Sequence, residues 1–465
     1  MLHAHDIYFV DGFANNRLDE MNLCFVSNDF PVLSFQKRDN QFQCCPSTRV
    51  ATSLSTPMMI RSGSVHDSDA TNPVGVEDLD KILAIELNNA VLDDVTSLVE
   101  AVFPDKYLPF AVNKTLLRSL KDVYGKNGWI GPALGSESTT AEWLNGIGKF
   151  KIHALVTSTD TFNGIANDLV AKRQIHLRRW WCSSNHASPV KGSPIKRKPD
   201  LVLVDAHRPE DWVPEWKDIR AIGELTSQKS LTRKLRNQIL NKVYVAMNKQ
   251  DDRCFIVFLT FVDTSFYLTL CDRAGVVYSS AYNIHGDALR LLRILTGLMC
   301  SEEHVLGHDP TIRRGPDDTV VAISIAGVEY EVIKKLFSSS SLRGRATRCW
   351  HVKKDEEEFV IKDGWIHEGR KSSEADILRQ ISGVACVPTL FAAEDLKHPG
   401  DPNVTDSTRL YRAGVDYDEA RLHRRILMQP VGTSIWSFTS KKELVGAFMD
   451  IVTSKVAYLY CRTWS

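Results

Sequence analysis

The sequence lacks the patterns that mark a secreted, membrane-spanning or strongly charged protein. Its 57 acidic and 57 basic residues leave a formal net charge of zero, which excludes a global attraction to nucleic acid or to an anionic membrane. No apolar run approaches the roughly 18 residues that a membrane helix needs, and residues 1–10 hold no basic stretch followed by an apolar one. We therefore expect an intracellular protein, cytoplasmic or nuclear, without a membrane partner.

Several common site motifs are absent as well. The ten cysteines form no CxxC pair and no Cys/His cluster at zinc spacing, which favours a reduced protein. There is no dinucleotide fingerprint, no Walker loop and no Ser-His-Asp elbow. His304, His308 and Asp309 lie close together in the sequence, but a spacing of four outside a predicted helix does not specify a metal site.

The length of the chain and the pattern of apolar and polar residues along it predict an α+β protein with two folded domains. A chain of 465 residues exceeds what one hydrophobic core usually serves. Residues 1–75 are polar without sustained periodicity, so we expect this region to be mostly disordered. Residues 76–310 predict an α/β domain, and the Gly-, Asp- and Pro-containing stretch 307–318 marks the boundary. Residues 311–465 are richer in strands.

Apolar periodicity places the expected elements within these two domains. In the first, we expect helices over residues 79–95, 116–123, 230–248 and 289–298, and strands over 201–204, 219–225, 254–261, 266–271 and 276–278. In the second, we expect strands over 319–325, 328–333, 347–352, 359–361, 387–391 and 425–429, and one helix over 373–381. An antiparallel sheet with one helix is the order of a protein-kinase N-lobe.

Three features in this second domain suit phosphoryl transfer. That chemistry needs a loop close over the nucleotide phosphates, a lysine on a neighbouring strand, and a glutamate on a helix to orient the lysine. Gly344 lies between two predicted strands, Lys362 ends the run 359–362 (FVIK), and Glu374 begins the predicted helix. Each feature has a structural alternative, since a glycine between strands is often only a turn and a lysine at a strand end is often a solvated charge.

Six sequence blocks, in one order, carry a family resemblance. They are residues 197–204 (RKPDLVLV), 222–224 (IGE), 271–279 (CDRAGVVYS), 306–311 (LGHDPT), 344–347 (GRAT) and 360–365 (VIKDGW). From about residue 195 to its end the chain resembles the fungal-type protein kinase family, abundant in mushroom-forming fungi. In that family an α/β region precedes a divergent kinase domain.

The resemblance implies ATP, with Mg²⁺, as cofactor and an unidentified protein as substrate or partner of Ser/Thr phosphorylation. It assigns Lys362 to the phosphates, Glu374 to the helix partner, and residues 428–432, with Gln429 and Val431, to the hinge that binds adenine. The implied nucleotide loop contains Gly344, Arg345, Ala346, Thr347 and Cys349. Ala346 stands where the family usually has glycine, and Cys349 stands where a valine would cover the adenine ring, so weaker nucleotide binding is expected.

The residues that would perform the transfer step are missing from the sequence. Kinases use a catalytic-loop aspartate, a downstream asparagine and the aspartate of a DFG motif. After residues 443–460, which resemble the αD and αE region, the chain ends in residues 461–465 (CRTWS) with no such motif. We expect no catalytic residue here and a lobe reduced to ATP binding or inactive, whether through a truncated gene, a mis-spliced transcript or a half-kinase that only mediates protein interactions.

The first domain offers a rival function. Asp200 opens a predicted strand and Glu224 ends the next, an arrangement similar to that of PD-(D/E)XK nucleases, where two carboxylates hold a divalent cation. Thr226 occupies the place of the lysine that helps to activate water, although Lys229 or Lys234 could substitute from the following helix. The alternative is that Asp200 belongs to a turn and Glu224 to an exposed strand end. A nuclease-like fold without activity fits the broken motif better than an active nuclease.

A basic and aromatic segment near this domain suggests nucleic acid as a further partner. The segment contains Arg178, Arg179, Trp180 and Trp181, and the basic run 196–198 follows it. Arginines can contact phosphates while tryptophans stack on bases. A solvated loop is the more common structure for such a run, and the run is too short to act as a nuclear-localisation signal.

Overall fold

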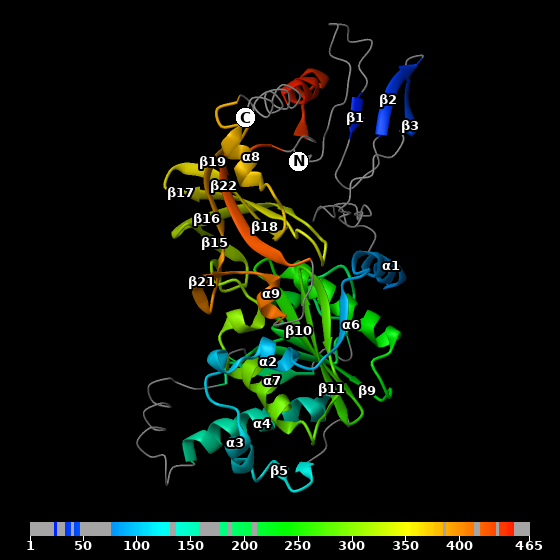
Figure 1. Cartoon of the computed structure of the whole chain (residues 1–465), viewed down its shortest axis with the longest axis vertical. Coiled ribbons are helices and arrows are strands. Elements are labelled where there is room, and N and C mark those ends of the chain that lie inside the picture. Colours follow the sequence, from blue (N-terminus) through cyan, green and yellow to red (C-terminus); the bar gives the residue numbers. More distant parts are fainter. Residues whose placement is uncertain are drawn as a thin grey trace.

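A computed structural model of the chain (Figure 1) describes residues 23–25, 33–38, 41–46, 76–130, 136–157, 177–183, 188–206, 212–384, 387–412, 419–433 and 437–450. Within residues 1–75 it describes three strands, β1 (Leu23–Phe25), β2 (Leu33–Arg38) and β3 (Gln41–Pro46), paired antiparallel in that order. The rest of the segment predicted to be disordered lies outside the described residues. None of the described helices is both long and apolar enough to cross a bilayer.

Helix α1 (Val76–Glu86) and strand β4 (Val91–Val95) replace the single helix predicted over residues 79–95. The prediction was wrong beyond Glu86, because side chains four residues apart share a face in a strand as well as in a helix. Between the two elements, Asn89 adopts a left-handed φ of 60°, a conformation that asparagine tolerates and that ends a helix.

An eight-stranded mixed sheet forms the centre of residues 76–310, which we call the α/β unit. Its order is β4, β12 (Gly275–Ser279), β11 (Ser265–Asp272), β10 (Phe255–Val262), β9 (Ala221–Thr226), β8 (Leu201–Asp205) and β7 (Arg179–Cys182), with β13 (Tyr282–Asn283) paired to β11. Strands β9 and β10 are parallel, because helix α6 (Arg233–Lys249) crosses over between them. The predicted strands and the helix over residues 230–248 are confirmed to within a few residues.

Helices cover both faces of this sheet, because its strands are apolar on both sides. In β8, Leu201 and Leu203 face one core cluster while Val202 and Val204 face the other. The first layer contains α2 (Leu98–Val102), α3 (Lys114–Ser119), α4 (Glu137–Thr157) and α7 (Ala288–Cys300), and the second contains α1 and α6. The helices predicted near residues 116–123 and 289–298 are α3 and α7.

A second, antiparallel sheet follows, which we call the C-terminal sheet. Its order is β14 (Ile312–Arg314), β15 (Val320–Ile325), β16 (Val328–Ser338), β17 (Arg348–Lys354), β18 (Glu357–His367), β22 (Arg421–Gln429) and β19 (Thr389–Asp395). Helix α8 (Glu374–Gln380) follows β18 in the chain and packs against β19 and β22. The predicted antiparallel sheet with one helix is confirmed, and β14 begins it within the predicted boundary stretch.

Smaller elements complete the described chain. They are β5 (Tyr124–Gly125), β6 (Gly128–Trp129), β20 (Lys397–His398), β21 (Asp401–Thr405), helix α9 (Thr408–Tyr411) and the 3-10 turns Asp105–Tyr107, Trp216–Asp218 and Glu303–Leu306. Residues 441–450 are helical, within the region predicted over 443–460 to resemble αD and αE, whose remainder lies outside the described residues.

A buried ion pair joins the segment between α9 and β22 to the α/β unit. Arg412, which follows α9, donates from Nη2 and Nε to the carboxylate of Asp272 at 2.6 and 2.7 Å, and both side chains are buried. Asp272 also accepts the N–H groups of Ala274 and Gly275. Trp365 packs into the first core cluster of the α/β unit, so the two sheets share apolar contacts as well as charge.

We predict that Asp272→Ala lowers the free energy of unfolding by about 3–5 kcal/mol, because the buried Arg412 guanidinium loses this carboxylate. Urea denaturation measures the change. The matched control is Glu329→Ala, which removes the partner of Arg313 from an exposed pair with 2.9 Å between nitrogen and oxygen and should cost at most about 1 kcal/mol. Equal losses in the two variants would contradict the role of the buried pair.

Candidate functional site

Lys362 and Glu374 form an ion pair between the C-terminal sheet and helix α8. The Lys362 Nζ lies 2.8 Å from Oε1 and 2.7 Å from Oε2 of Glu374. Lys362 is central in the sheet, since its β18 position pairs with Cys349 of β17 and with Ile426 of β22. The two side chains are 15% and 25% exposed, so the ammonium is held in place yet can be reached from solvent.

The sequence before α8 explains why Glu374 stands at the first turn of this helix. Ser373 is extended and caps the helix: its Oγ accepts the N–H of Asp376 at 3.2 Å, and the Asp376 carboxylate accepts the N–H of Ser373 at 2.9 Å. This capping box fixes the start of the helix. The hydrogen bonds from Ser373 also lower the pKa of Asp376, which keeps its carboxylate in the accepting form.

Residues 339–347 connect β16 to β17 and contain the predicted nucleotide loop except for Cys349, which lies on β17. Gly344 has a φ of 114°, and a Cβ there would meet no atom within 4 Å, so its backbone borders open space. Ala346 has a φ of 43° in the left-handed region, and its side chain is buried. The backbone at Ala346 thus adopts a conformation that suits glycine, which agrees with the sequence-based comparison at this position.

The α/β unit holds this loop through several contacts. The N–H of Gly344 donates to the Arg273 carbonyl at 2.9 Å, and Leu342 is buried in the second core cluster of the α/β unit. The guanidinium of Arg343 donates to the Glu86 carbonyl at 3.1 Å, while the N–H of Arg343 donates to the Glu86 carboxyl group. A sequence pattern gives no sign of this docking, because every partner is distant in the chain.

The predicted adenine and phosphate ends lie on opposite sides of Lys362. On one side, the N–H of Trp365 donates to the carbonyl of Arg345 in the loop at 2.8 Å. On the other side, β22 runs past Lys362 and ends at Gln429, whose side-chain amide donates to the Glu358 carbonyl at 2.8 Å. Thr347 lies at the end of the loop that precedes β17, and Cys349 pairs with Lys362 across the two strands. Val431 follows the end of β22.

A comparison with known protein families decides to which family the chain belongs. A sequence model of the family described as fungal protein kinase matches residues 198–420 and 402–460, more than half of the chain. The chain belongs to the fungal protein kinase family. No curated protein and no solved structure matches it.

In this fungal protein kinase family member, the matched region begins before the C-terminal sheet and includes two carboxylates of the α/β unit. Asp200 accepts the Leu225 N–H at 2.8 Å, one residue beyond Glu224, so the two acidic residues lie side by side at neighbouring strands. Burial raises the pKa of Glu224 to about 7, and the nearby Asp200 carboxylate adds to the rise. Burial also raises the pKa of Asp200.

The lysine beside these carboxylates is Lys242 of α6, which forms a buried ion pair with Glu224. Lys229 and Lys234, the lysines considered from the sequence, are exposed. Lys242 is three residues from Ile239 and one from Val243, on the side of the helix that faces the sheet. A lysine among the apolar residues on one side of a predicted helix indicates a buried charge that needs a partner, and the sequence-based prediction did not use this signal.

The basic and aromatic segment does not form one surface in this family member. Arg179 is buried and donates to the Ser301 carbonyl at 2.8 Å, and Trp181 is buried in the core. Arg197 donates to Asn241 at 2.6 Å. Trp180 remains exposed, beside the surface ion pair of Arg178, so stacking and phosphate contact by the whole segment is not supported by this arrangement.

We predict that Glu86→Gln flattens the pH dependence of stability between about pH 4.5 and 7. Burial raises the pKa of Glu86 from 4.5 to about 7 in the folded chain. In that window the folded state binds more protons than the unfolded state, so the free energy of unfolding falls as the pH rises. Replacing Glu86 removes this contribution, and the slope becomes shallower.

Urea denaturation at a series of pH values checks the Glu86 prediction. Glu331→Gln is the control, because it changes an exposed glutamate of β16 and should leave the slope as it is. The same slope in wild type and Glu86→Gln would mean that the Glu86 carboxyl group does not titrate differently in the two states.

Proposed function

We propose that the C-terminal sheet of this fungal protein kinase family member is a nucleotide-binding lobe for ATP. The ion pair between Lys362 and Glu374 is the observation that carries the proposal, because kinases orient their phosphate-binding lysine with a helix glutamate in this way. In this proposal Lys362 binds the phosphates and Glu374 sets the direction of its ammonium group.

The neighbouring residues suit the rest of the nucleotide. The backbone of Gln429 and Val431 would bind the adenine edge, and Cys349, which pairs with Lys362 across the strands, would lie against the ring. The backbone around Gly344, with Arg345 and Thr347, would lie near the phosphates. Mg²⁺ would neutralise phosphate charge when bound with the nucleotide.

Protein phosphorylation is the activity that the family name implies, and its substrate would be a protein that the sequence does not identify. The transfer step needs a group that accepts the proton of the substrate hydroxyl. None of the residues placed around Lys362 has that role, so the proposed function of the described residues is nucleotide binding.

We predict that ATP with Mg²⁺ raises the melting temperature of the wild-type chain and that Lys362→Met removes most of this shift. A ligand present at about 100 times its Kd adds about 2.7 kcal/mol to stability, which corresponds to several degrees. Glu374→Gln should reduce the shift less. It keeps the positive charge of Lys362 but removes the carboxylate that holds the ammonium group in one orientation. Differential scanning fluorimetry measures all three proteins.

The control for this experiment is Lys353→Met on the adjacent strand β17. Lys353 pairs with Glu331 on the surface at 3.2 Å, so losing it removes a strand lysine without touching the Lys362 ion pair. An ATP shift that survives Lys362→Met, or that Lys353→Met removes equally, would refute the proposed site.

A second candidate function rests on the buried group formed by Asp200, Glu224 and Lys242. Paired carboxylates with a nearby lysine are the set with which PD-(D/E)XK nucleases hold a divalent cation and activate water. Lys242 reaches Glu224 from α6, which offers a replacement for the lysine that is missing at Thr226. We propose metal-dependent cleavage of nucleic acid as the alternative activity of the α/β unit.

If the alternative is right, the chain cleaves DNA in Mg²⁺ or Mn²⁺, and Asp200→Ala, Glu224→Ala and Lys242→Met each reduce the rate by at least about 100-fold. Gel assays with plasmid DNA measure the rate. Lys234→Met, an exposed lysine on the same helix, is the control and should cleave like wild type. Cleavage that all variants retain would indicate a contaminating nuclease.

A further inference from the structure

A small cavity lies where the α/β unit meets the C-terminal sheet. Its volume is about 20 Å³, and its lining includes Cys254, His308, Asp406, Tyr411 and His423. A cavity of this size holds one water molecule or one ion. These five side chains are buried, and a buried polar group is costly unless it has a partner.

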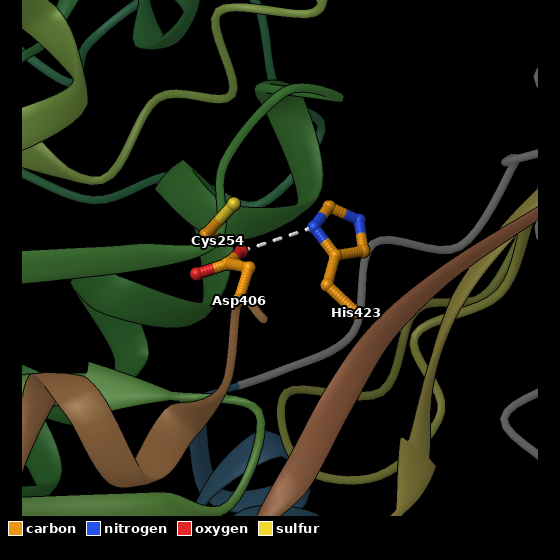
Figure 2. A group of neighbouring side chains, drawn as sticks. All are labelled: Cys254, Asp406 and His423. Carbon is orange, nitrogen blue, oxygen red and sulfur yellow. Dashed lines mark hydrogen bonds and ion pairs between the residues drawn. The ribbon is translucent and has the colours of Figure 1, made fainter. Parts of the chain in front are cut away.

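Three donor atoms of different kinds converge at this cavity (Figure 2). The Cys254 sulfur, a carboxylate oxygen of Asp406 and a ring nitrogen of His423 all lie within 4.8 Å of one another, and all three residues are buried. The His423 Nδ1 is 3.3 Å from the Asp406 Oδ2. Thiolate, imidazole and carboxylate are the ligands that zinc takes in proteins.

Outer groups hold two of these side chains as metal ligands are held in proteins. The His423 Nε2 lies 3.0 Å from Oδ2 of Asp363, and Oδ1 of the same carboxylate accepts from Arg425 at 2.9 Å. The second oxygen of Asp406 accepts the Tyr411 hydroxyl at 2.5 Å. A carboxylate behind a ligating histidine fixes its tautomer and its ring orientation.

A second histidine at the same cavity carries an independent sign of a ligand. His308 has its Nδ1 2.8 Å from Asp252, so that it too has a carboxylate behind it. Its Nε2 is buried and, among the described residues, meets no hydrogen-bond partner. An imidazole nitrogen left this way costs stability unless something occupies the cavity.

We propose that this cavity binds a zinc ion through Cys254, Asp406 and His423, with the fourth position filled by a water molecule, in the cavity that His308 also lines. Binding would release the thiol proton of Cys254 and the proton on the His423 Nδ1. Cys254 directly precedes β10 of the α/β unit, and His423 lies on β22 of the C-terminal sheet. The ion would therefore cross-link the two sheets and act structurally, not catalytically.

The same side chains also suit a metal-free arrangement, with His423 as an imidazolium between Asp363 and Asp406 and Cys254 as a neutral thiol. Burial raises the pKa of that thiol to about 12, although the nearby His423 lowers it in part. A measurement that detects the metal and its bond to sulfur separates the two arrangements.

The experiment uses the full chain, loaded with zinc, dialysed, and analysed by inductively coupled plasma mass spectrometry. We expect about one zinc ion per chain, and at least about tenfold less in Cys254→Ser and in Asp406→Asn at the same free zinc. Cys300→Ser is the control, because Cys300 is also a buried cysteine but lies outside the cavity lining. It should keep its zinc.

Cobalt substitution gives a second readout that does not depend on the variants folding. Co²⁺ bound to wild type should show the charge-transfer absorption of a cobalt–thiolate bond, and a strong chelator should remove it and lower the melting temperature. Wild type that holds no zinc, wild type without the thiolate absorption, or zinc retained in both ligand variants would overturn the proposal.

Discussion

The buried carboxylate of Asp363 sets the orientation of the strand on which the candidate site depends. It is held between His423 and Arg425 at the junction with the α/β unit, and these two partners keep its pKa well below the usual range despite its burial. Adjacent residues of a strand face opposite sides. Since Asp363 must face the buried junction, Lys362 faces helix α8 and Glu374. The adjacent residues Lys362 and Asp363 therefore serve two sides of the sheet: Asp363 anchors the strand at the junction, and Lys362 points to helix α8.

Contacts near this junction also connect the proposed nucleotide loop to the α/β unit. Arg425 pairs with Asp363 within the C-terminal sheet and also with Asp309, which precedes that sheet in the chain. Arg412, between α9 and β22, pairs with Asp272 of the α/β unit, so the buried Asp272 carboxylate is neutralised only when this segment packs on the α/β unit. Arg273 follows Asp272 in the chain, and its carbonyl accepts the N–H of Gly344 in the loop. Kinase loops that cover phosphates usually close by moving; here the closure would be coupled to the packing of a second unit, and the proposed zinc ion would strengthen that coupling.

Much of the fold was predictable because it follows local rules. The strands around Asp200, Glu224 and Lys362 and the helix that carries Lys242 have the periodicity and end signals that their environments require. The helix over residues 79–95 was mispredicted because its spacing of four fits two kinds of structure. The pairing of Lys362 with Glu374 was also foreseeable, since a strand lysine and the first turn of the next helix are close in the chain.

The sequence by itself determined the family, most of the strands and helices, and which lysine and glutamate form the ion pair, because these depend on residue types at short spacing. Only the tertiary structure decided that Lys242, not Lys229 or Lys234, meets Glu224, and that Cys254, Asp406 and His423 meet at one cavity. The residues of each group are far apart in the chain. They meet because of how helices and sheets pack, and no local sequence pattern shows which distant residues will be in contact.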